Sequence, residues 1–188
     1  VDSGVSYKSI AAAQEHTCGI TMTGVLKCWG RGQFVRLGDG DTVDRLTPVV
    51  IDSGVNYKSI TAGSSHTCGI TDSGVLKCWG SQGSGRLGIG PLTPVTSPTP
   101  IDSGVVYDIV SAGNDHTCGI TDLGVLKCWG GNFYGQVGDT TNENKLVPTI
   151  INSGVAYKRI AAGSNMTCAI TSLNALKCWG QNTRFQVS

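Results

Sequence analysis

The stretch HTCGITDSGVLKCWG at residues 66–80 recurs almost unchanged four times in this chain. Written in rows of fifty, the whole sequence aligns without a gap, with HTCGI at 16 and 116 and MTCAI at 166. A fixed period of this length is typical of stacked supersecondary units, as in a propeller or a solenoid. We therefore interpret the chain as one repeat domain over 1–188, with repeats at 1–50, 51–100, 101–150 and 151–188.

Each row contains about four short runs that look like β-strands. In row one they are YKSIAA, HTCGIT, VLKCW and, at 47–51, TPVVI. Pro48, Pro98 and Pro148 occupy one equivalent position, which suits the start or edge of a strand. Gly is frequent, charged residues make up only 14%, and no stretch keeps a helical period. The sequence predicts an all-β propeller array with four-stranded antiparallel blades of ~50 residues.

The two cysteines of each row lie on one predicted hairpin. If 22–24 form a three-residue loop, Ile20 faces Leu26 and Cys18 faces Cys28. The last loop position is Gly in rows one to three and Asn174 in row four, as a left-handed backbone requires. Opposed residues of a non-hydrogen-bonded pair have Cα atoms ~4.5 Å apart, close enough for a disulfide. The register predicts the bonds Cys18–Cys28, Cys68–Cys78, Cys118–Cys128 and Cys168–Cys178.

The cysteine spacing favours disulfides over the alternatives. Zinc knuckles usually place paired cysteines two to four residues apart, whereas nine residues separate these. A redox site would use Cys-x-x-Cys, which the sequence lacks. Four stapled hairpins indicate an oxidising compartment, so we expect a secreted or cell-surface protein.

Composition argues against several function classes. The formal net charge is +1, which gives no electrostatic reason to expect a nucleic-acid partner. No apolar run approaches the ~18 residues that span a bilayer, and no leader pattern opens the sequence. The sequence shows no catalytic constellation and no phosphate-binding glycine loop ahead of a helix. We expect neither an enzyme nor a bound cofactor or metal, and no membrane insertion.

The unit at 111–150 resembles the repeat of the regulator-of-chromosome-condensation family. The features that carry the resemblance are Ala112-Gly113, His116-Thr117, Gly124, Trp129-Gly130, Asn132, Gly135-Gln136-Val137-Gly138 and Pro148. The resemblance implies a β-propeller, usually of seven blades, whose face loops bind proteins. Relatives include nuclear exchange factors for a small GTPase, domains of ubiquitin ligases and secreted bacterial inhibitors of β-lactamases. In its paired cysteines the chain resembles the secreted bacterial members of the family.

Two recurrent side chains have both a structural and a functional interpretation. His16, His66 and His116 could ligate a metal, but Met166 in row four favours a packed residue that bonds within or between blades. The four Trp residues could stack on sugars, but a Trp in every copy better fits the space between blades. The recurrent Lys of LKCWG, as at Lys77, is expected on a solvated strand face.

The rows differ most just after Trp-Gly. The segments there read RGQFVR, SQGSGR, GNFYGQ and QNTRFQ, and they hold all three Phe residues. Aromatic, Arg, Asn and Gln side chains on variable loops of a rigid fold are typical of a recognition surface. The alternative is that these loops have merely drifted. The predicted ligand-binding residues are Phe34, Arg36, Arg86, Asn132, Phe133, Tyr134, Gln136, Arg184 and Phe185.

These observations favour an extracellular recognition or adhesion module that binds a protein or glycan on a cell surface through loops on one propeller face. A purely structural repeat, such as the spacer or tip of a surface fibre, and a secreted inhibitor remain alternatives. Row four stops before a TPVVI-type segment, so the sequence supplies three copies of that strand for four copies of the others. Exposed strand edges invite pairing, and we expect a homo-oligomer or part of a longer polypeptide.

Overall fold

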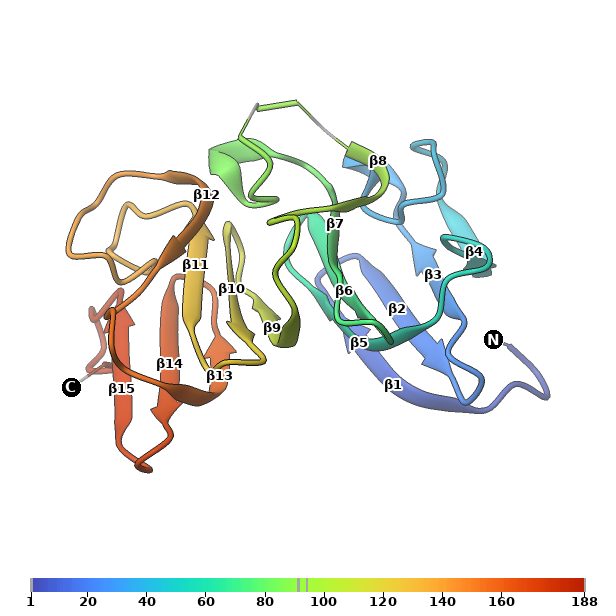
Figure 1. The fold of residues 1–188 in the computed structure, drawn as a ribbon. Helices are drawn as coiled ribbons and strands as arrows, with labels where there is room; N and C mark the ends of the chain where they lie inside the picture. The colour runs from blue at the N-terminus through green and yellow to red at the C-terminus, as the bar shows by residue number, and fades with distance from the viewer. Residues whose placement is uncertain (1, 91, 94, 188) are drawn as a thin grey trace.

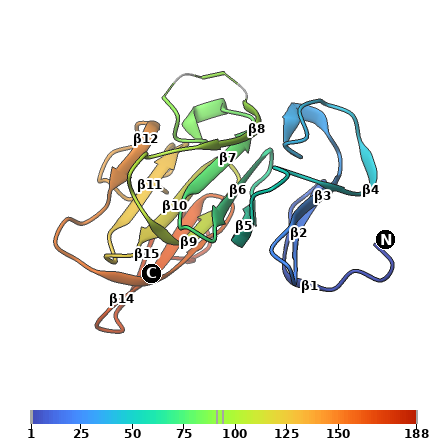
Figure 2. The ribbon, with the colours of Figure 1, turned by 45° about the vertical axis from the view of Figure 1, so that its right-hand side comes forward.

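The computed structural model describes residues 2–90, 92–93 and 95–187 as four antiparallel sheets arranged side by side along a curved array (Figure 1). The first strand of each sheet contacts the first strand of the next, so these strands line the inner side of the array. The turned view in Figure 2 shows the same succession of sheets. The predicted all-β, propeller-type architecture is confirmed.

Each sheet is a meander built from one row of the sequence. The first contains β1 (Tyr7–Ala12), β2 (His16–Thr21), β3 (Leu26–Gly30) and β4 (Arg45–Val50). The second contains β5 (Tyr57–Ala62), β6 (His66–Thr71), β7 (Leu76–Gly80) and β8 (Val95–Pro100). The third contains β9 (Tyr107–Ala112), β10 (His116–Thr121), β11 (Leu126–Gly130) and β12 (Lys145–Ile150). Among the described residues the fourth has three strands rather than four: β13 (Tyr157–Ala162), β14 (Met166–Thr171) and β15 (Leu176–Gly180).

The predicted hairpin register is confirmed in every row. In the first hairpin Ile20 pairs with Leu26 and Cys18 pairs with Cys28. The loop residue before the second strand is left-handed, with φ of +89° at Gly24 and +68° at Asn174. All four expected disulfides are present, each with a Cα–Cα distance of 4.1 Å. The bonds lie within a row and staple each blade internally.

The recurrent proline lies on the outermost strand of its sheet. Pro48 is the fourth residue of β4, which pairs only with β3 in its sheet. The ladder between β3 and β4 is irregular between Cys28 and Gly30, opposite this part of the strand. Proline has no N–H to donate, so it is tolerated where one side of the strand has no ladder to form. The expected edge position is confirmed.

The core lies between successive sheets rather than within one. Ile20, Leu26 and Leu37 of row one pack in one cluster with Tyr57 and Trp79 of row two, all fully buried. The next two junctions repeat this arrangement. Burial of such apolar surface stabilises by roughly 25 cal/mol per Å². Each row is therefore stabilised chiefly by its neighbour, as in other repeat proteins.

The recurrent lysine is more enclosed than the sequence suggested. Lys77 Nζ lies 2.6 Å from Asp52 Oδ2, and the Tyr57 hydroxyl donates to the same oxygen at 2.6 Å. The Tyr57 ring covers Gly69, where a Cβ atom would come within 2.8 Å of the ring. Rows one and three repeat this group, but row four has Asn152 in place of the aspartate and its Lys177 is exposed. Three of the four lysines are thus paired rather than solvated.

Candidate recognition surface

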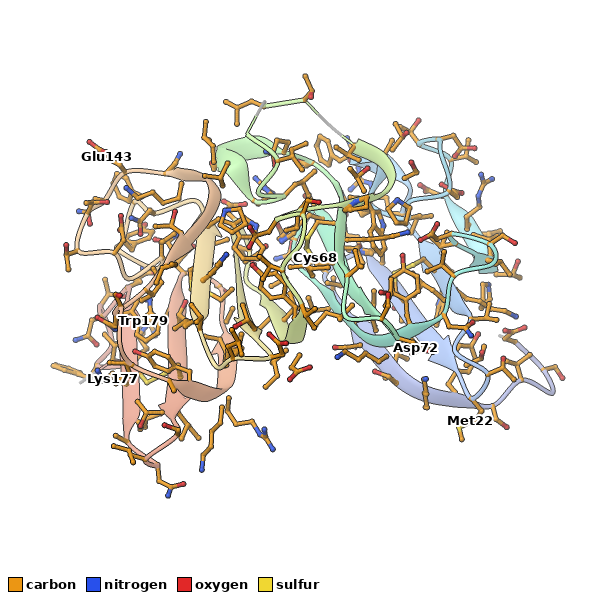
Figure 3. The ribbon with its side chains drawn as sticks, viewed as in Figure 1. Met22, Cys68, Asp72, Glu143, Lys177 and Trp179 are labelled. Atoms are coloured by element: carbon orange, nitrogen blue, oxygen red, sulfur yellow. A yellow bond between two sulfur atoms is a disulfide. The ribbon has the colours of Figure 1, made fainter. Side chains whose placement is uncertain are left out.

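The variable loops all leave the same end of their sheets. They follow Gly30, Gly80, Gly130 and Gly180, which end β3, β7, β11 and β15. Figure 1 shows the first three loops along the upper edge of the array, and Figure 3 shows the loop residue Glu143 there. The hairpin turns that carry Met22 and Asp72 lie toward the lower edge. Segments fifty residues apart in the sequence therefore share one surface.

A repeated set of hydrogen bonds fixes where each loop ends. The Arg36 carbonyl accepts from Thr67 Oγ1 at 2.8 Å and from Trp79 Nε1 at 3.1 Å. Thr67 Oγ1 also lies 2.9 Å from His16 Nε2. Since the threonine hydroxyl gives its proton to the carbonyl, His16 must donate from Nε2. We call this group the interblade latch, and it recurs as His66, Thr117, Arg86 and Trp129 and again as His116, Thr167, Gln136 and Trp179.

The latch histidines are neutral and tightly enclosed. Burial lowers the pKa of His16 and of His116 to about 4, and burial also holds the pKa of His66 well below its usual value. The ring of His66 lies against Gly63, where a Cβ atom would stand 2.2 Å from a ring carbon. In row four Met166 takes this place beside Gly163. The interpretation of these histidines as residues that bond between blades is confirmed.

The recurrent tryptophan also has a structural place. Trp79 and Trp129 are fully buried, and their ring nitrogens donate across the junction. Gly88 passes close beneath the second of these rings, since a Cβ atom there would lie 2.8 Å from Trp129 Nε1. The expectation that tryptophan fills the space between blades is confirmed for these two rows.

Arg36 was expected on the surface, but its side chain lies inside. It is 1% exposed and forms an ion pair with Glu15 at 2.8 Å. Its Nε donates to the Gln33 carbonyl at 2.8 Å and its Nη1 to the Ser64 carbonyl at 3.3 Å. A buried guanidinium requires such partners, because an unpaired buried charge is strongly unfavourable. The sequence suggested exposure because Arg36 lies in a variable loop whose aromatic, Arg, Asn and Gln composition is typical of a recognition surface.

Arg86 and Gln136 perform the same bracing in their own loops. Arg86 Nε donates to the Gly83 carbonyl at 2.8 Å, and its guanidinium pairs with Asp115 at 2.9 Å. Gln136 is buried, and its Oε1 accepts from the backbone N–H of Tyr134 at 2.9 Å. The residue at this position is arginine in rows one and two and glutamine in rows three and four. In every row its side chain forms a hydrogen bond with the backbone of its own loop.

Asn132, a further predicted ligand-binding residue, is also fully buried. Its Nδ2 donates to Asp139 Oδ1 and to the carbonyls of Thr141 and Glu143, at 2.9, 2.9 and 3.1 Å. Its Oδ1 accepts from Val137 N–H at 2.9 Å. Every polar atom of the amide is used within the loop, so this side chain holds the loop in shape.

The remaining predicted residues reach solvent. Phe34 is 48% exposed, Phe133 76%, Tyr134 42% and Phe185 85%, and Arg184 is also exposed. The rings of Phe133 and Tyr134 stand edge to face with centroids 5.0 Å apart. Such a pair is a favourable aromatic geometry. The row-three loop therefore presents two adjoining aromatic side chains on a braced backbone.

These two aromatics border a hollow of about 480 Å³. This volume lies within the range of about 300–1,000 Å³ that is usual for ligand pockets. The sequence prediction missed several of its walls, which come from rows two, three and four: Ser84, Asp115, Asn142, Asn144 and Asn165. The asparagine-rich run at 139–144 was a sequence signal for Asn142 and Asn144. The other three residues reach the hollow only because the rows stack against one another.

The sequence profile of the regulator of chromosome condensation (RCC1) repeat matches 24–70 and 124–170, and a second profile of the same description matches 57–86, 108–136 and 157–186. The chain belongs to the RCC1 repeat family. Propellers of this family are commonly protein-binding modules, typically without enzymatic activity. In the described residues no helix has the length and apolar character needed to cross a membrane.

Individual relatives extend the comparison. The ultraviolet-B receptor UVR8 of Arabidopsis thaliana is 47% identical over 45 residues, which cover 24% of this chain and 10% of the receptor. The fold is similar to that of human WBSCR16, with a TM-score of 0.84 and 23% identity over 97% of this chain and 50% of that one. It is also similar to yeast RCC1 (Prp20) bound to Kap60, with a TM-score of 0.82 and 24% identity over 97% and 45%. The chain thus spans about half the length, or less, of these proteins.

Proposed function

We propose that this chain is an extracellular recognition module that binds a protein or a glycan on a cell surface through the variable loops. One observation carries the proposal: exposed aromatic side chains lie on the variable loops, and the interblade latch fixes the loop ends of rows one, two and three. Phe34, Phe133 and Phe185 all reach solvent on this surface. Aromatic side chains on a preorganised backbone supply contact area at low entropic cost.

The extracellular part of the proposal is supported by the four disulfides. Each closes within one hairpin, and no described cysteine is free. Disulfides persist in oxidising compartments and are rare in the cytosol. The family supports binding rather than catalysis, since the structure of Prp20 bound to Kap60 shows a relative holding a protein partner.

The test compares two exposed apolar sites on opposite edges of the array. The wild-type chain, Phe133→Ala/Tyr134→Ala and Leu123→Ala are applied to arrays of extracellular protein ectodomains and of glycans. Leu123 is 82% exposed but lies in a hairpin turn, away from the loops. We expect the double variant to lose at least about tenfold in binding, because aromatic anchors dominate interfaces. The Leu123→Ala variant should bind like the wild type.

Wild-type binding that both variants retain would contradict the proposal. Absence of any wild-type ligand on either array would favour a purely structural repeat instead. The thermal midpoint of the double variant should stay close to the wild-type value, since exposed substitutions usually cost under about 0.5 kcal/mol. A large fall in the midpoint would show that these side chains support the fold.

A further inference from the structure

We propose that the hollow beside Phe133 and Tyr134 is a carbohydrate subsite that takes a neutral sugar ring through neighbouring hydroxyl groups. The inference rests on the proposed function and names the chemistry of its ligand. Three features of the hollow carry it: amide donors held in place, acceptors beside them, and an aromatic wall without free positive charge.

The donors are two side-chain amides whose oxygens are already used. Gln136 Oε1 accepts from the backbone N–H of Tyr134 at 2.9 Å, and Asn144 Oδ1 accepts from that of Asn132 at 3.0 Å. Each amide is therefore oriented, and its NH₂ group is the end left over for a ligand. Within the part of the chain that the structure describes, neither NH₂ group has a protein partner. Both residues line the hollow.

One acceptor comes from row four and the other from row three itself. Asn165 Nδ2 donates to Gln181 Oε1 at 3.1 Å, which leaves Asn165 Oδ1 to accept. Asp115 Oδ1 pairs with Arg86 at 2.9 Å, which leaves Oδ2 to accept. A hydroxyl group both donates and accepts, so a surface that mixes fixed donors and acceptors suits adjacent hydroxyls better than it suits a ligand of one polarity.

The aromatic wall and the charge balance restrict the ligand further. Phe133 is 76% exposed and can cover the C–H face of a sugar ring, while Tyr134 supports it edge to face. Among the described residues that line the hollow only Asp115 is charged, and it is paired with Arg86, which lies outside the lining. An acidic ligand would find no free cation here among the described lining residues. The hollow therefore favours a neutral sugar over an anionic one.

Row one offers a contrast at the same place in the repeat. Where row three has Gly131, Thr141 and Asn144, row one has Arg31, Asp41 and Asp44. Arg31 pairs with Glu15, and Asp41 pairs with Arg45. Both loops keep one ion pair, Arg45–Asp39 in row one and Lys145–Asp139 in row three. At the positions of Gly131 and Asn144, which line the hollow, row one instead carries the charged Arg31 and Asp44. The composition of the hollow is specific to row three and its neighbours.

The experiment uses the chain displayed in several copies on streptavidin, since multivalent display raises weak affinities. The probe is an array of neutral and of sialylated or sulfated glycans. Glycans bound by the wild type are then titrated against Phe133→Ala, Asn144→Ala and Asn165→Ala, with Leu123→Ala in the exposed hairpin turn of row three as the control. We expect the first three variants each to bind about tenfold more weakly, or about 1.4 kcal/mol, and the control to change by less than about twofold.

The outcomes separate failure of the subsite from failure of the proposed function. Binding only of anionic glycans, or loss of glycan binding in Leu123→Ala but not in Asn144→Ala, would overturn the subsite. A silent glycan array would also overturn it, and the proposed function would still stand if ectodomain binding is lost in Phe133→Ala/Tyr134→Ala. Silence on both arrays would overturn both. Circular dichroism of Asn144→Ala distinguishes lost contacts from a misfolded loop, because Asn144 also accepts from Asn132 N–H.

Discussion

The interblade latches and the loops that they hold differ in how much sequence change they tolerate. The latch keeps Thr and Trp in all three junctions, and its carbonyl comes from Arg36, Arg86 or Gln136. The loops conserve neither the size nor the charge of their side chains, since Asp44 of row one accepts the backbone hydrogen bond that the neutral Asn144 accepts in row three. The latch needs specific side chains because two donors from one blade converge on one carbonyl of the previous blade.

The same contrast explains why the loop end accepts either arginine or glutamine. The latch uses only the backbone carbonyl of that residue, so its side chain is free to serve the loop. Arg36 then reaches Glu15, while Gln136 turns back to Tyr134 N–H. The backbone contact at this position is therefore constant while its side chain varies, so the loop sequence can change without disturbing the latch.

The largest expected effect breaks a latch in the middle of the array. Trp129→Ala should lower the free energy of unfolding by about 3–5 kcal/mol, because it empties a buried site and removes a hydrogen bond. Trp29→Ala is the control, since Trp29 is half-buried and has no such hydrogen bond among the described residues. Urea unfolding measures both. Equal losses in the two variants would show that the latch adds nothing beyond burial.

The next effect concerns acid. His16 and His116 have folded pKa values of about 4, below the unfolded value of about 6.5, so the folded state binds fewer protons. Their stabilising contribution is complete above about pH 6.5 and is lost as the pH falls toward 4. We expect the free energy of unfolding to drop by about 3 kcal/mol for each of these two histidines over that interval.

The control for the acid prediction is a variant in which a latch histidine is replaced by the methionine that row four carries at the same position. Row four has Met166 at the latch-histidine position, so His116→Met should fold with less dependence on pH than the wild type. Urea midpoints at pH 7, 5.5 and 4 give the comparison. If the variant loses as much stability in acid as the wild type, carboxylates rather than latch histidines control the acid response.

The smallest effect is expected in a loop. Phe34→Ala should change the free energy of unfolding by no more than about 1 kcal/mol, although the Arg36 guanidinium lies 5.5 Å from the ring centre. The contact adds little because the Phe34 ring is 48% exposed and the guanidinium is already paired with Glu15. Thermal denaturation at neutral pH is sufficient to measure it. A loss as large as that of Trp129→Ala would place this loop within the supporting fold and would remove the contrast with the latch.

Much of the fold could be predicted because it depends on local patterns that repeat. The hairpin register followed from one loop length, and the left-handed Asn174 in row four agreed with the glycines of the other rows. The disulfides followed from that register, since Cys18 and Cys28 are directly opposed. Pro48 marked the edge strand because it lacks an N–H.

The candidate site could be predicted only in part. Exposed aromatics such as Phe133 were recognised from their place in a variable loop, but Asn132 and Gln136 were assigned to the surface and are buried. Polar side chains look alike in a sequence whether they face solvent or satisfy a loop backbone. Only the partners decide between these roles, and for the Asn132 side chain the partners lie up to eleven residues away.

The sequence by itself determined the period, the strands, the hairpin register and the four disulfides, because each depends on contacts within about a dozen residues. The tertiary structure decided which histidine nitrogen donates, which loop residues are braces and which rows share the hollow beside Phe133. The histidine tautomer and the shared hollow depend on contacts between residues about 30 to 50 positions apart, such as His66 with Thr117 and Arg86 with Asp115. The braces depend on partners within the loop, which the type of a polar side chain does not reveal. The repeated sequence determines the structure of each blade, whereas the packing of neighbouring blades determines the surface that they share.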